Sequence, residues 1–192
     1  MNDKQIKLII SDFDGTLFDT FEANYLAYKS VLKEYFIDLD YEIYKKLFGF
    51  RIGDLANKLG LIDLEIIQSI KEKKSRAYLD YFEYIQPNNV LLSFLESFKS
   101  TGKPIVLAST ARLENIRNIL DYFNKSNLFD FVISEELVLK GKPDPECFNF
   151  AMAKFDVKPS ETLIFEDSTI GIEAAQRSNA NYIAVNKLFY GN

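Results

Sequence analysis

The 192-residue sequence predicts an α/β fold, namely a doubly wound, parallel, Rossmann-like sheet with an inserted α-helical cap domain. Two observations carry this prediction. Five short runs are apolar on both faces instead of alternating, which is typical of parallel strands covered on both sides. Segments of helix length lie between the last four runs, and this alternation indicates right-handed β-α-β units.

The expected strands are short and widely spaced. They are residues 7–12, 105–109, 131–134, 162–165 and 182–185. Between them, apolar residues recur at helical spacing, so we expect helices around residues 113–123 and 148–155. A further helix over residues 88–100 would lead into the second strand.

The first crossover differs from the others. Residues 19–87 contain no convincing strand and show helical periodicity throughout. Three or four helices fit, with breaks near residues 38–40, 49–53 and 60–63. An insertion of this length after the first strand is too long for a simple crossover, so we interpret it as a helical cap (residues 19–87). The catalytic core would then comprise residues 1–18 and 88–192.

The charge of the chain argues against nucleic acid as a partner. The formal net charge is −5, from 28 acidic and 23 basic residues. A nucleic-acid-binding surface needs clustered Lys and Arg. Lys71, Lys73 and Lys74 come nearest to a cluster, and we interpret them as one solvated helix face.

The lack of histidine and the presence of only one cysteine limit the catalytic mechanisms and metal sites that this chain can form. The chain has no histidine, which excludes Ser-His-Asp and Cys-His mechanisms and the commonest zinc ligand. Its one cysteine, Cys147, excludes an intramolecular disulfide and CxxC metal sites. The apolar run 8–10 is too short for a signal peptide or a membrane helix. We therefore expect a cytoplasmic protein with no membrane partner.

Polar side chains follow the strands at their carboxyl ends, where open α/β sheets bind ligands. They are Asp12, Asp14, Ser109, Thr110, Glu166 and Asp167, and Lys142 would join them from a turn just before a helix. Each has an ordinary structural explanation by itself, such as a turn or a helix cap. Together, however, the acids would repel one another unless a cation lay among them. Mg²⁺ prefers such oxygen ligands, so we expect it as the cofactor.

Specific roles follow from this grouping. Asp12 and Asp167 would bind Mg²⁺, joined by Glu166 and a backbone carbonyl near Asp14. A phosphate docked there would meet the Lys142 ammonium and the hydroxyl of Ser109, with Thr110 beside it. Free N–H groups of the helix after Ser109 would add to this site.

Four motifs resemble those of the haloacid dehalogenase superfamily, in the expected order. They are residues 12–19 (DFDGTLFD), 107–109 (LAS), 141–145 (GKPDP) and 165–175 (FEDSTIGIEAA). The inserted segment resembles the helical cap of the β-phosphoglucomutase and phosphoglycolate phosphatase branch. The resemblance implies a monomeric phosphatase that acts on a small phosphorylated metabolite.

The resemblance also implies residue roles. Asp12 would be the nucleophile that forms an aspartyl-phosphate, and Asp14 the general acid and then the base. Ser109 and Lys142 would hold the phosphate, and Lys142 would balance the charge of Asp12. Asp12, Asp14 through its carbonyl, Glu166 and Asp167 would bind Mg²⁺.

The cap region departs from the mutases of this branch. These mutases, and many of their sugar-phosphatase relatives, carry a histidine shortly after the first motif, where this chain has Asn24. Asparagine cannot transfer that proton, which favours hydrolysis over a phosphosugar mutase reaction. Arg51, Thr20 and Asn24 are the candidates for substrate specificity.

A receiver-like, phospho-accepting signalling domain is a further alternative. Receivers also group acids, a hydroxyl and a lysine around an acceptor aspartate. Their acceptor ends a middle strand, and they lack a long insertion after the first strand. Residues 19–87 therefore argue against this alternative.

Overall fold

The computed structural model describes residues 5–48, 52–186 and 190 of the chain. It divides into two compact units. One comprises Met1–Asp19 and Pro87–Asn192, and the other comprises Thr20–Gln86. We call the first the sheet unit and the second the helical unit.

The sheet unit contains five parallel strands in the order β5-β4-β1-β6-β7. The strands are β1 (Leu8–Ser11), β4 (Ile105–Ala108), β5 (Phe131–Ile133), β6 (Thr162–Glu166) and β7 (Asn181–Ala184). The predicted fold class is confirmed, and each predicted strand boundary agrees to within one residue. The order reverses beside β1, which is the kind of position where doubly wound sheets bind ligands.

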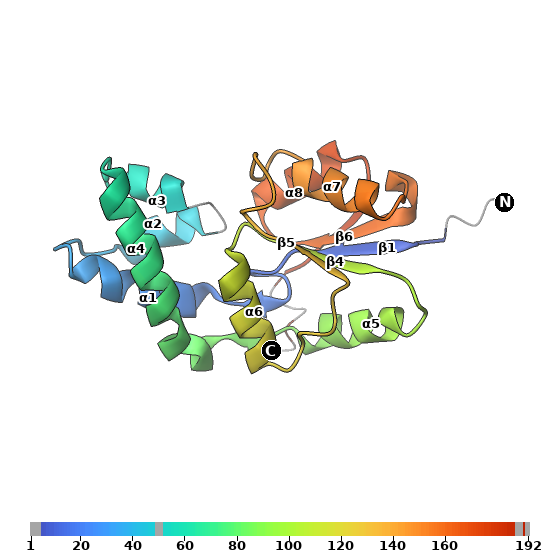
Figure 1. Cartoon of the computed structure of the whole chain (residues 1–192), viewed down its shortest axis with the longest axis horizontal. Coiled ribbons are helices and arrows are strands. Elements are labelled where there is room, and N and C mark those ends of the chain that lie inside the picture. The colour runs from blue at the N-terminus through green and yellow to red at the C-terminus, as the bar shows by residue number, and fades with distance from the viewer. Residues whose placement is uncertain (1–4, 49–51, 187–189, 191–192) are drawn as a thin grey trace. The chain divides into compact units, whose positions relative to one another are not determined.

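Helices cover both faces of this sheet. They are α5 (Asn89–Lys99), α6 (Leu113–Tyr122), α7 (Glu146–Lys154) and α8 (Thr169–Arg177), with a short 3₁₀ helix η2 (Pro159–Glu161) before β6. Figure 1 shows α7 and α8 on one face of the sheet and α5 and α6 on the other. Phe148 of α7 belongs to the same apolar core as Ile10, Val106 and Ile164 of the strands, and all four side chains are fully buried. This double burial explains why the central strands β1, β4 and β6 are apolar on both faces, whereas all four residues of the edge strand β7 are exposed.

A second, two-stranded sheet pairs β2 (Phe18–Asp19) with β3 (Gln86–Pro87). The prediction that residues 19–87 hold no strand is wrong at this point. A strand of two residues is too short to produce a periodic pattern, so the sequence carries no signal for it.

The described part of the helical unit contains four α-helices followed by a 3₁₀ helix. They are α1 (Phe21–Lys33), α2 (Tyr41–Leu47), α3 (Ile52–Lys58), α4 (Leu64–Ala77) and η1 (Tyr78–Tyr84). Asp40 and Asp63 cap α2 and α4 by accepting hydrogen bonds from backbone N–H groups. Leu32, Leu55 and Ile70 belong to a separate apolar core of this unit.

Lys74 corrects one interpretation of the sequence. It is only 5% exposed, and its Nζ lies 3.9 Å from the centroid of the Tyr78 ring. It is therefore not part of a solvated helix face. Lys73, by contrast, is partly exposed and pairs with Glu34 at 2.6 Å. Charge counts cannot separate the two, because the difference depends on which aromatic rings lie beside each side chain.

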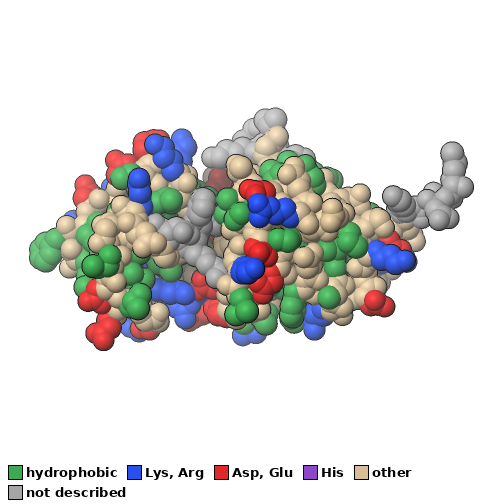
Figure 2. Space-filling view, turned by 90° about the horizontal axis from the view of Figure 1, so that it is seen from above, with side chains coloured by type: hydrophobic (Ala, Val, Ile, Leu, Met, Phe, Trp, Pro, Cys, Tyr) green, Lys and Arg blue, Asp and Glu red, His purple; other side chains and the backbone are tan. Residues whose placement is uncertain are grey.

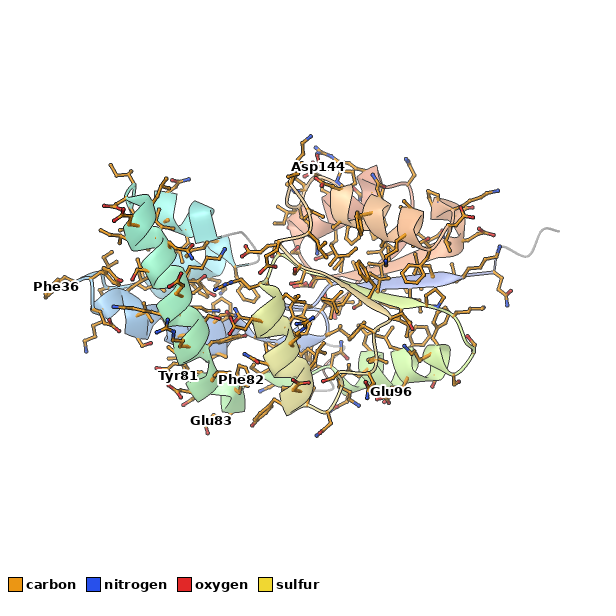
Figure 3. All side chains as sticks on the ribbon, viewed as in Figure 1. Phe36, Tyr81, Phe82, Glu83, Glu96 and Asp144 are labelled. Atoms are coloured by element: carbon orange, nitrogen blue, oxygen red, sulfur yellow. The ribbon has the colours of Figure 1, made fainter. Side chains whose placement is uncertain are left out.

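Several helices end at a residue with left-handed backbone geometry. Asn124, Asp156 and Asn179 adopt it at φ of 56°, 51° and 59°, and Asn and Asp tolerate it well. Phe36 adopts it at φ 58° after α1 and is fully exposed. Figure 3 shows Phe36 pointing away from the helices of its unit.

No broad field of one charge stands out on the face that Figure 2 displays. Acidic and basic side chains are interspersed there. Within residues 5–48, 52–186 and 190, no helix combines the length and the apolar character needed to cross a bilayer.

Candidate active site

Strands β1 and β6 bring the predicted carboxylates together. The two strands are neighbours, and Ser11 pairs with Phe165 in their register. Asp12 follows directly after β1, and its N–H donates to the Phe165 carbonyl at 2.9 Å. Ligand oxygens of Asp12, Glu166 and Asp167 all lie within 4.8 Å of one another. Three of the predicted metal ligands therefore share one edge of the sheet.

Lys142 lies among these carboxylates. Its Nζ is 2.6 Å from Oδ1 of Asp12 and 2.5 Å from Oε2 of Glu166, and it also donates to the Ala108 carbonyl at 3.2 Å. The Lys142 side chain is only 3% exposed. One ammonium group thus links the carboxyl ends of β1, β4 and β6.

The electrostatics of the cluster follow from burial and crowding. Burial and the neighbouring Glu166 raise the pKa of Asp12 well above its usual value, and Lys142 only partly offsets this. Burial and Glu166 also raise the pKa of Asp167, to about 7. Although burial alone would lower it, the Asp12 and Glu166 carboxylates hold the pKa of Lys142 above its usual value.

The donor set fits a hard divalent cation. With all groups ionised, the three carboxylates and Lys142 leave two negative charges uncompensated. All the ligand atoms are oxygens, which Mg²⁺ prefers. A divalent cation would balance this charge and relieve the repulsion that, after burial, raises the pKa values of Asp12 and Asp167.

Asp167 is held in place by the turn after β1. The Thr16 hydroxyl donates to Oδ1 of Asp167 at 2.8 Å, and Thr16 is completely buried. Gly15 has φ +88°, and a Cβ there would collide with the Asp167 carboxylate. The sequence analysis did not identify Thr16, although its place inside the first motif was a usable signal.

Glu166 is held by the start of α8. Its Oε1 accepts from the Ser168 hydroxyl at 2.9 Å and from the N–H groups of Asp167 and Ser168 at 3.2 Å. Ser168 also caps α8 through the N–H of Gly171. A Cβ at Gly171 would collide with the Glu166 carboxylate. The glycine therefore leaves the space that this carboxylate occupies.

Ser109 and Asp14 face each other at the end of β4. The Ser109 hydroxyl lies 3.4 Å from Oδ2 of Asp14, a weak hydrogen bond, and accepts from the N–H of Ala111 at 3.0 Å. Thr110 is the next residue along and is partly exposed. Asp14 is also partly exposed, unlike Asp12.

The expectation of free N–H groups in the helix after Ser109 is wrong at its first residue. Helix α6 begins at Leu113 after the N-cap residue Arg112. The Leu113 N–H lies 3.3 Å from both carboxylate oxygens of Glu136. The Glu136 side chain, which follows β5 in the chain, thus accepts from the Leu113 N–H group. The local sequence around Leu113 does not predict that contact.

Two of the candidates for specificity lie in the helical unit. Asn24 on α1 donates to the Thr20 carbonyl and to the Tyr78 hydroxyl, both at 3.0 Å. Its Oδ1 accepts from Nζ of the buried Lys74 at 2.5 Å. Thr20 is completely buried just before α1. Arg51 falls outside the described residues.

Tyr190 is a further neighbour of the carboxylate cluster, and the sequence motifs did not point to it. Its hydroxyl is buried and forms no hydrogen bond within the part of the chain that the structure describes. Burial, and next the Asp167 carboxylate, raise the pKa of the phenol, with Asp19 contributing as well. A tyrosine so distant in sequence from the four motifs carries no local signal.

The chain is similar in sequence to known enzymes. Residues 9–185 match the sequence profile described as haloacid dehalogenase-like hydrolase. The chain belongs to this family. A phosphorylated carbohydrates phosphatase of Thermotoga maritima is 26% identical over 93% of this chain and 84% of its own length. A fructose-1-phosphate phosphatase of Escherichia coli is 25% identical, over 94% of this chain and 96% of its own length.

Mutases of the same family are equally similar. A β-phosphoglucomutase of Bacillus subtilis is 27% identical over 94% of this chain and 83% of its own length. The crystal structure of a β-phosphoglucomutase from Clostridium difficile has a TM-score of 0.82 at 26% identity, covering 95% of this chain and 86% of that one. The predicted family and branch are thus confirmed, and the protein is an enzyme of the hydrolase family.

Proposed function

We propose that this protein is a Mg²⁺-dependent phosphatase that hydrolyses a small phosphorylated metabolite through an aspartyl-phosphate on Asp12. The observation that carries the proposal is the buried cluster of Asp12, Lys142, Glu166 and Asp167 at the carboxyl ends of the strands. Such a cluster has little value for stability alone, because buried charges are costly to desolvate.

In this proposal, the carboxylates of Asp12, Glu166 and Asp167 hold Mg²⁺ together with the Asp14 backbone carbonyl. The bound ion supplies positive charge next to the phosphoryl oxygens. Lys142, Ser109 and Thr110 bind the same phosphate. Lys142 is already charged and buried, so it needs no reorganisation to do so.

The reaction has two steps. A carboxylate oxygen of Asp12 attacks phosphorus, and the bond from phosphorus to the ester oxygen breaks while Asp14 gives that oxygen a proton. Water then attacks the phosphorus of the aspartyl-phosphate and gives a proton to Asp14. Inorganic phosphate leaves, and the Asp12 carboxylate is restored. Two easier displacements replace one difficult displacement.

The partial exposure of Asp14 suits its assigned role. Asp12 is 6% exposed, whereas Asp14 is open enough to exchange protons with solvent or a substrate oxygen. The weak contact between Ser109 and Asp14 would bring the proton donor close to a phosphate bound at Ser109.

The names of the relatives support a sugar phosphate as the metabolite. The Thermotoga maritima relative is a phosphatase of phosphorylated carbohydrates, and the Escherichia coli relative acts on fructose 1-phosphate. We therefore place sugar phosphates first among the substrates to test.

A phosphosugar mutase is the second candidate, because β-phosphoglucomutases are among the similar proteins. The environment of Asn24 argues against it. Both ends of its amide are engaged, by Lys74, Tyr78 and the Thr20 carbonyl, and the amide does not titrate near neutral pH. Turnover of β-glucose 1-phosphate to glucose 6-phosphate with a bisphosphate activator would favour the mutase instead.

The sheet order argues against the receiver-like alternative. Taken in chain order, the five parallel strands lie as 3-2-1-4-5, whereas receiver-type sheets follow 2-1-3-4-5. The phospho-accepting residue proposed here follows the first strand of the sheet.

The test is a panel of phosphorylated metabolites, led by hexose and pentose phosphates, assayed for phosphate release with Mg²⁺ and with EDTA. Asp12→Asn keeps the size of the side chain and serves as the control. We expect release that EDTA abolishes and that the variant lowers by at least about 10³-fold. Substantial turnover by the variant with Mg²⁺ present would refute the mechanism.

A further inference from the structure

We propose that Asn88 is a positioning residue for the metal site, acting through Thr16 on Asp167. This inference rests on the proposed function, because it concerns the same carboxylate cluster. Asn88 follows β3 and precedes α5, and it belongs to none of the four motifs. It is completely buried, as is Thr16.

Asn88 holds the turn after β1 by two hydrogen bonds. Its side-chain Nδ2 donates to the Thr16 carbonyl at 3.0 Å, and its backbone N–H donates to the Leu17 carbonyl at 2.8 Å. Two successive carbonyls of the turn are therefore satisfied by one residue from a distant part of the chain. An unsatisfied carbonyl at such a buried place would be costly.

The same turn carries the contact to the proposed metal ligand. The Thr16 hydroxyl donates to Oδ1 of Asp167 at 2.8 Å. A continuous series of hydrogen bonds therefore runs from the Asn88 amide through Thr16 to Asp167. Groups that orient metal ligands in this way typically change metal affinity by about 10- to 100-fold when they are removed.

The alternative is that Asn88 serves only as a helix cap. Its Oδ1 does accept from the Leu91 N–H at 3.1 Å at the start of α5. A cap, however, needs only an acceptor, and serine or aspartate would serve as well. The donor half of the amide is not needed for capping, and it is this half that contacts Thr16. The two roles therefore use different atoms and can be separated.

Asn88→Ser separates them, because serine can still cap α5 but cannot reach the Thr16 carbonyl. Asn181→Ser is the control for the loss of amide-to-carbonyl hydrogen bonds, made at an exposed asparagine. Asn181 also donates its amide to backbone carbonyls, those of Ser160 and Thr162 at 3.2 and 3.0 Å, but at the start of β7, at the opposite end of the strands. If Asn88→Ser does not fold, Asn88→Asp is nearly isosteric and keeps the acceptor.

The readout is the Mg²⁺ concentration that half-saturates the rise in melting temperature of the full chain, without substrate. We expect about a 10-fold increase for Asn88→Ser and less than 2-fold for Asn181→Ser. The Mg²⁺ dependence of p-nitrophenyl phosphate hydrolysis should shift in parallel, with KM at saturating Mg²⁺ unchanged. A half-saturating concentration for Asn88→Ser or Asn88→Asp equal to that of Asn181→Ser would overturn the inference. If the unmutated chain showed neither a Mg²⁺-dependent shift nor turnover, the proposed function itself would fail.

Discussion

The ammonium of Lys142 lies 2.6 Å from Oδ1 of Asp12, and both side chains are at least nine-tenths buried. Oε2 of Glu166 lies 2.5 Å from the same ammonium. Lys142 therefore supplies the positive charge that both buried carboxylates contact. Its removal should affect stability and turnover together.

Lys142→Met should abolish most activity and destabilise the fold. Methionine fills a similar volume but leaves buried carboxylates without their cation, and such losses typically cost about 3–5 kcal/mol. Urea unfolding should show this loss without Mg²⁺ and a smaller loss with Mg²⁺. Lys99→Met is the control, because Lys99 pairs with Asp130 at the partly exposed surface and should change stability by about 1 kcal/mol or less. Equal losses in the two variants would contradict the prediction.

Mg²⁺ should stabilise the protein more at pH 8 than at pH 5.5. The pKa of Asp167 is raised to about 7 in the metal-free protein, above the value of about 3.9 in unfolded chains. Between these values the folded state binds more protons, so metal-free stability falls as pH rises from about 4 to 7. Mg²⁺ competes with those protons and binds best once they have left.

Melting temperatures with and without Mg²⁺ across this pH range check the prediction. In Asp167→Asn the extra stabilisation at high pH should be much reduced. A Mg²⁺ effect of equal size at pH 5.5 and pH 8 in the unmutated chain would mean that Asp167 does not take part in binding.

Gly171→Ala should weaken the metal site through a single methyl group. The added Cβ would overlap the Glu166 carboxylate, so either the helix or the carboxylate must move. Overpacking of this kind costs about 1–3 kcal/mol. Turnover should fall at least about 10-fold, with a higher Mg²⁺ requirement.

Gly53→Ala is the matched control for Gly171→Ala. Gly53 also lies in a helix, α3, but a Cβ there meets no atom within 4 Å. This substitution should stabilise the chain by up to about 1 kcal/mol, because alanine favours helix. If both variants keep full activity, Glu166 does not depend on the space at Gly171.

Asp14→Asn should affect substrates according to their leaving groups. A sugar alkoxide needs a proton to depart, whereas p-nitrophenolate does not. We expect kcat/KM to fall about 10²- to 10⁴-fold for a sugar phosphate and far less for p-nitrophenyl phosphate. Since kcat/KM reports the first displacement, an equal fall for both substrates would show that Asp14 is not the proton donor.

Strands β4 and β6 were predictable because burial on both faces leaves a continuous apolar run, as in residues 105–108 and 163–165. The grouping of Asp12, Glu166 and Asp167 was predictable for a related reason. Parallel strands end at a common edge, so the residues after them must lie close together. Neither inference requires knowledge of any side-chain contact.

Other contacts could not be predicted, because they join residues far apart in the sequence. Thr16 meets Asp167 across 151 positions, and Asn88 meets Thr16 across 72. The Lys74 side chain lies over the rings of Tyr28 and Tyr78, and the helical periodicity of the sequence does not predict these contacts. Glu136 occupies the first N–H of α6 from another loop. Each depends on packing geometry that local patterns do not contain.

The pairing of Ser11 with Phe165 has a consequence for how such a site can be altered or transferred. Because Asp12 and Glu166 each follow a member of that pair, the hydrogen-bonded ladder sets their separation. A slip of one residue would displace one carboxylate by about 3.3 Å and turn it to the opposite face. Exchanges among apolar residues inside either strand would leave this spacing intact. Grafting the pair onto another parallel sheet would require moving both segments together, in register.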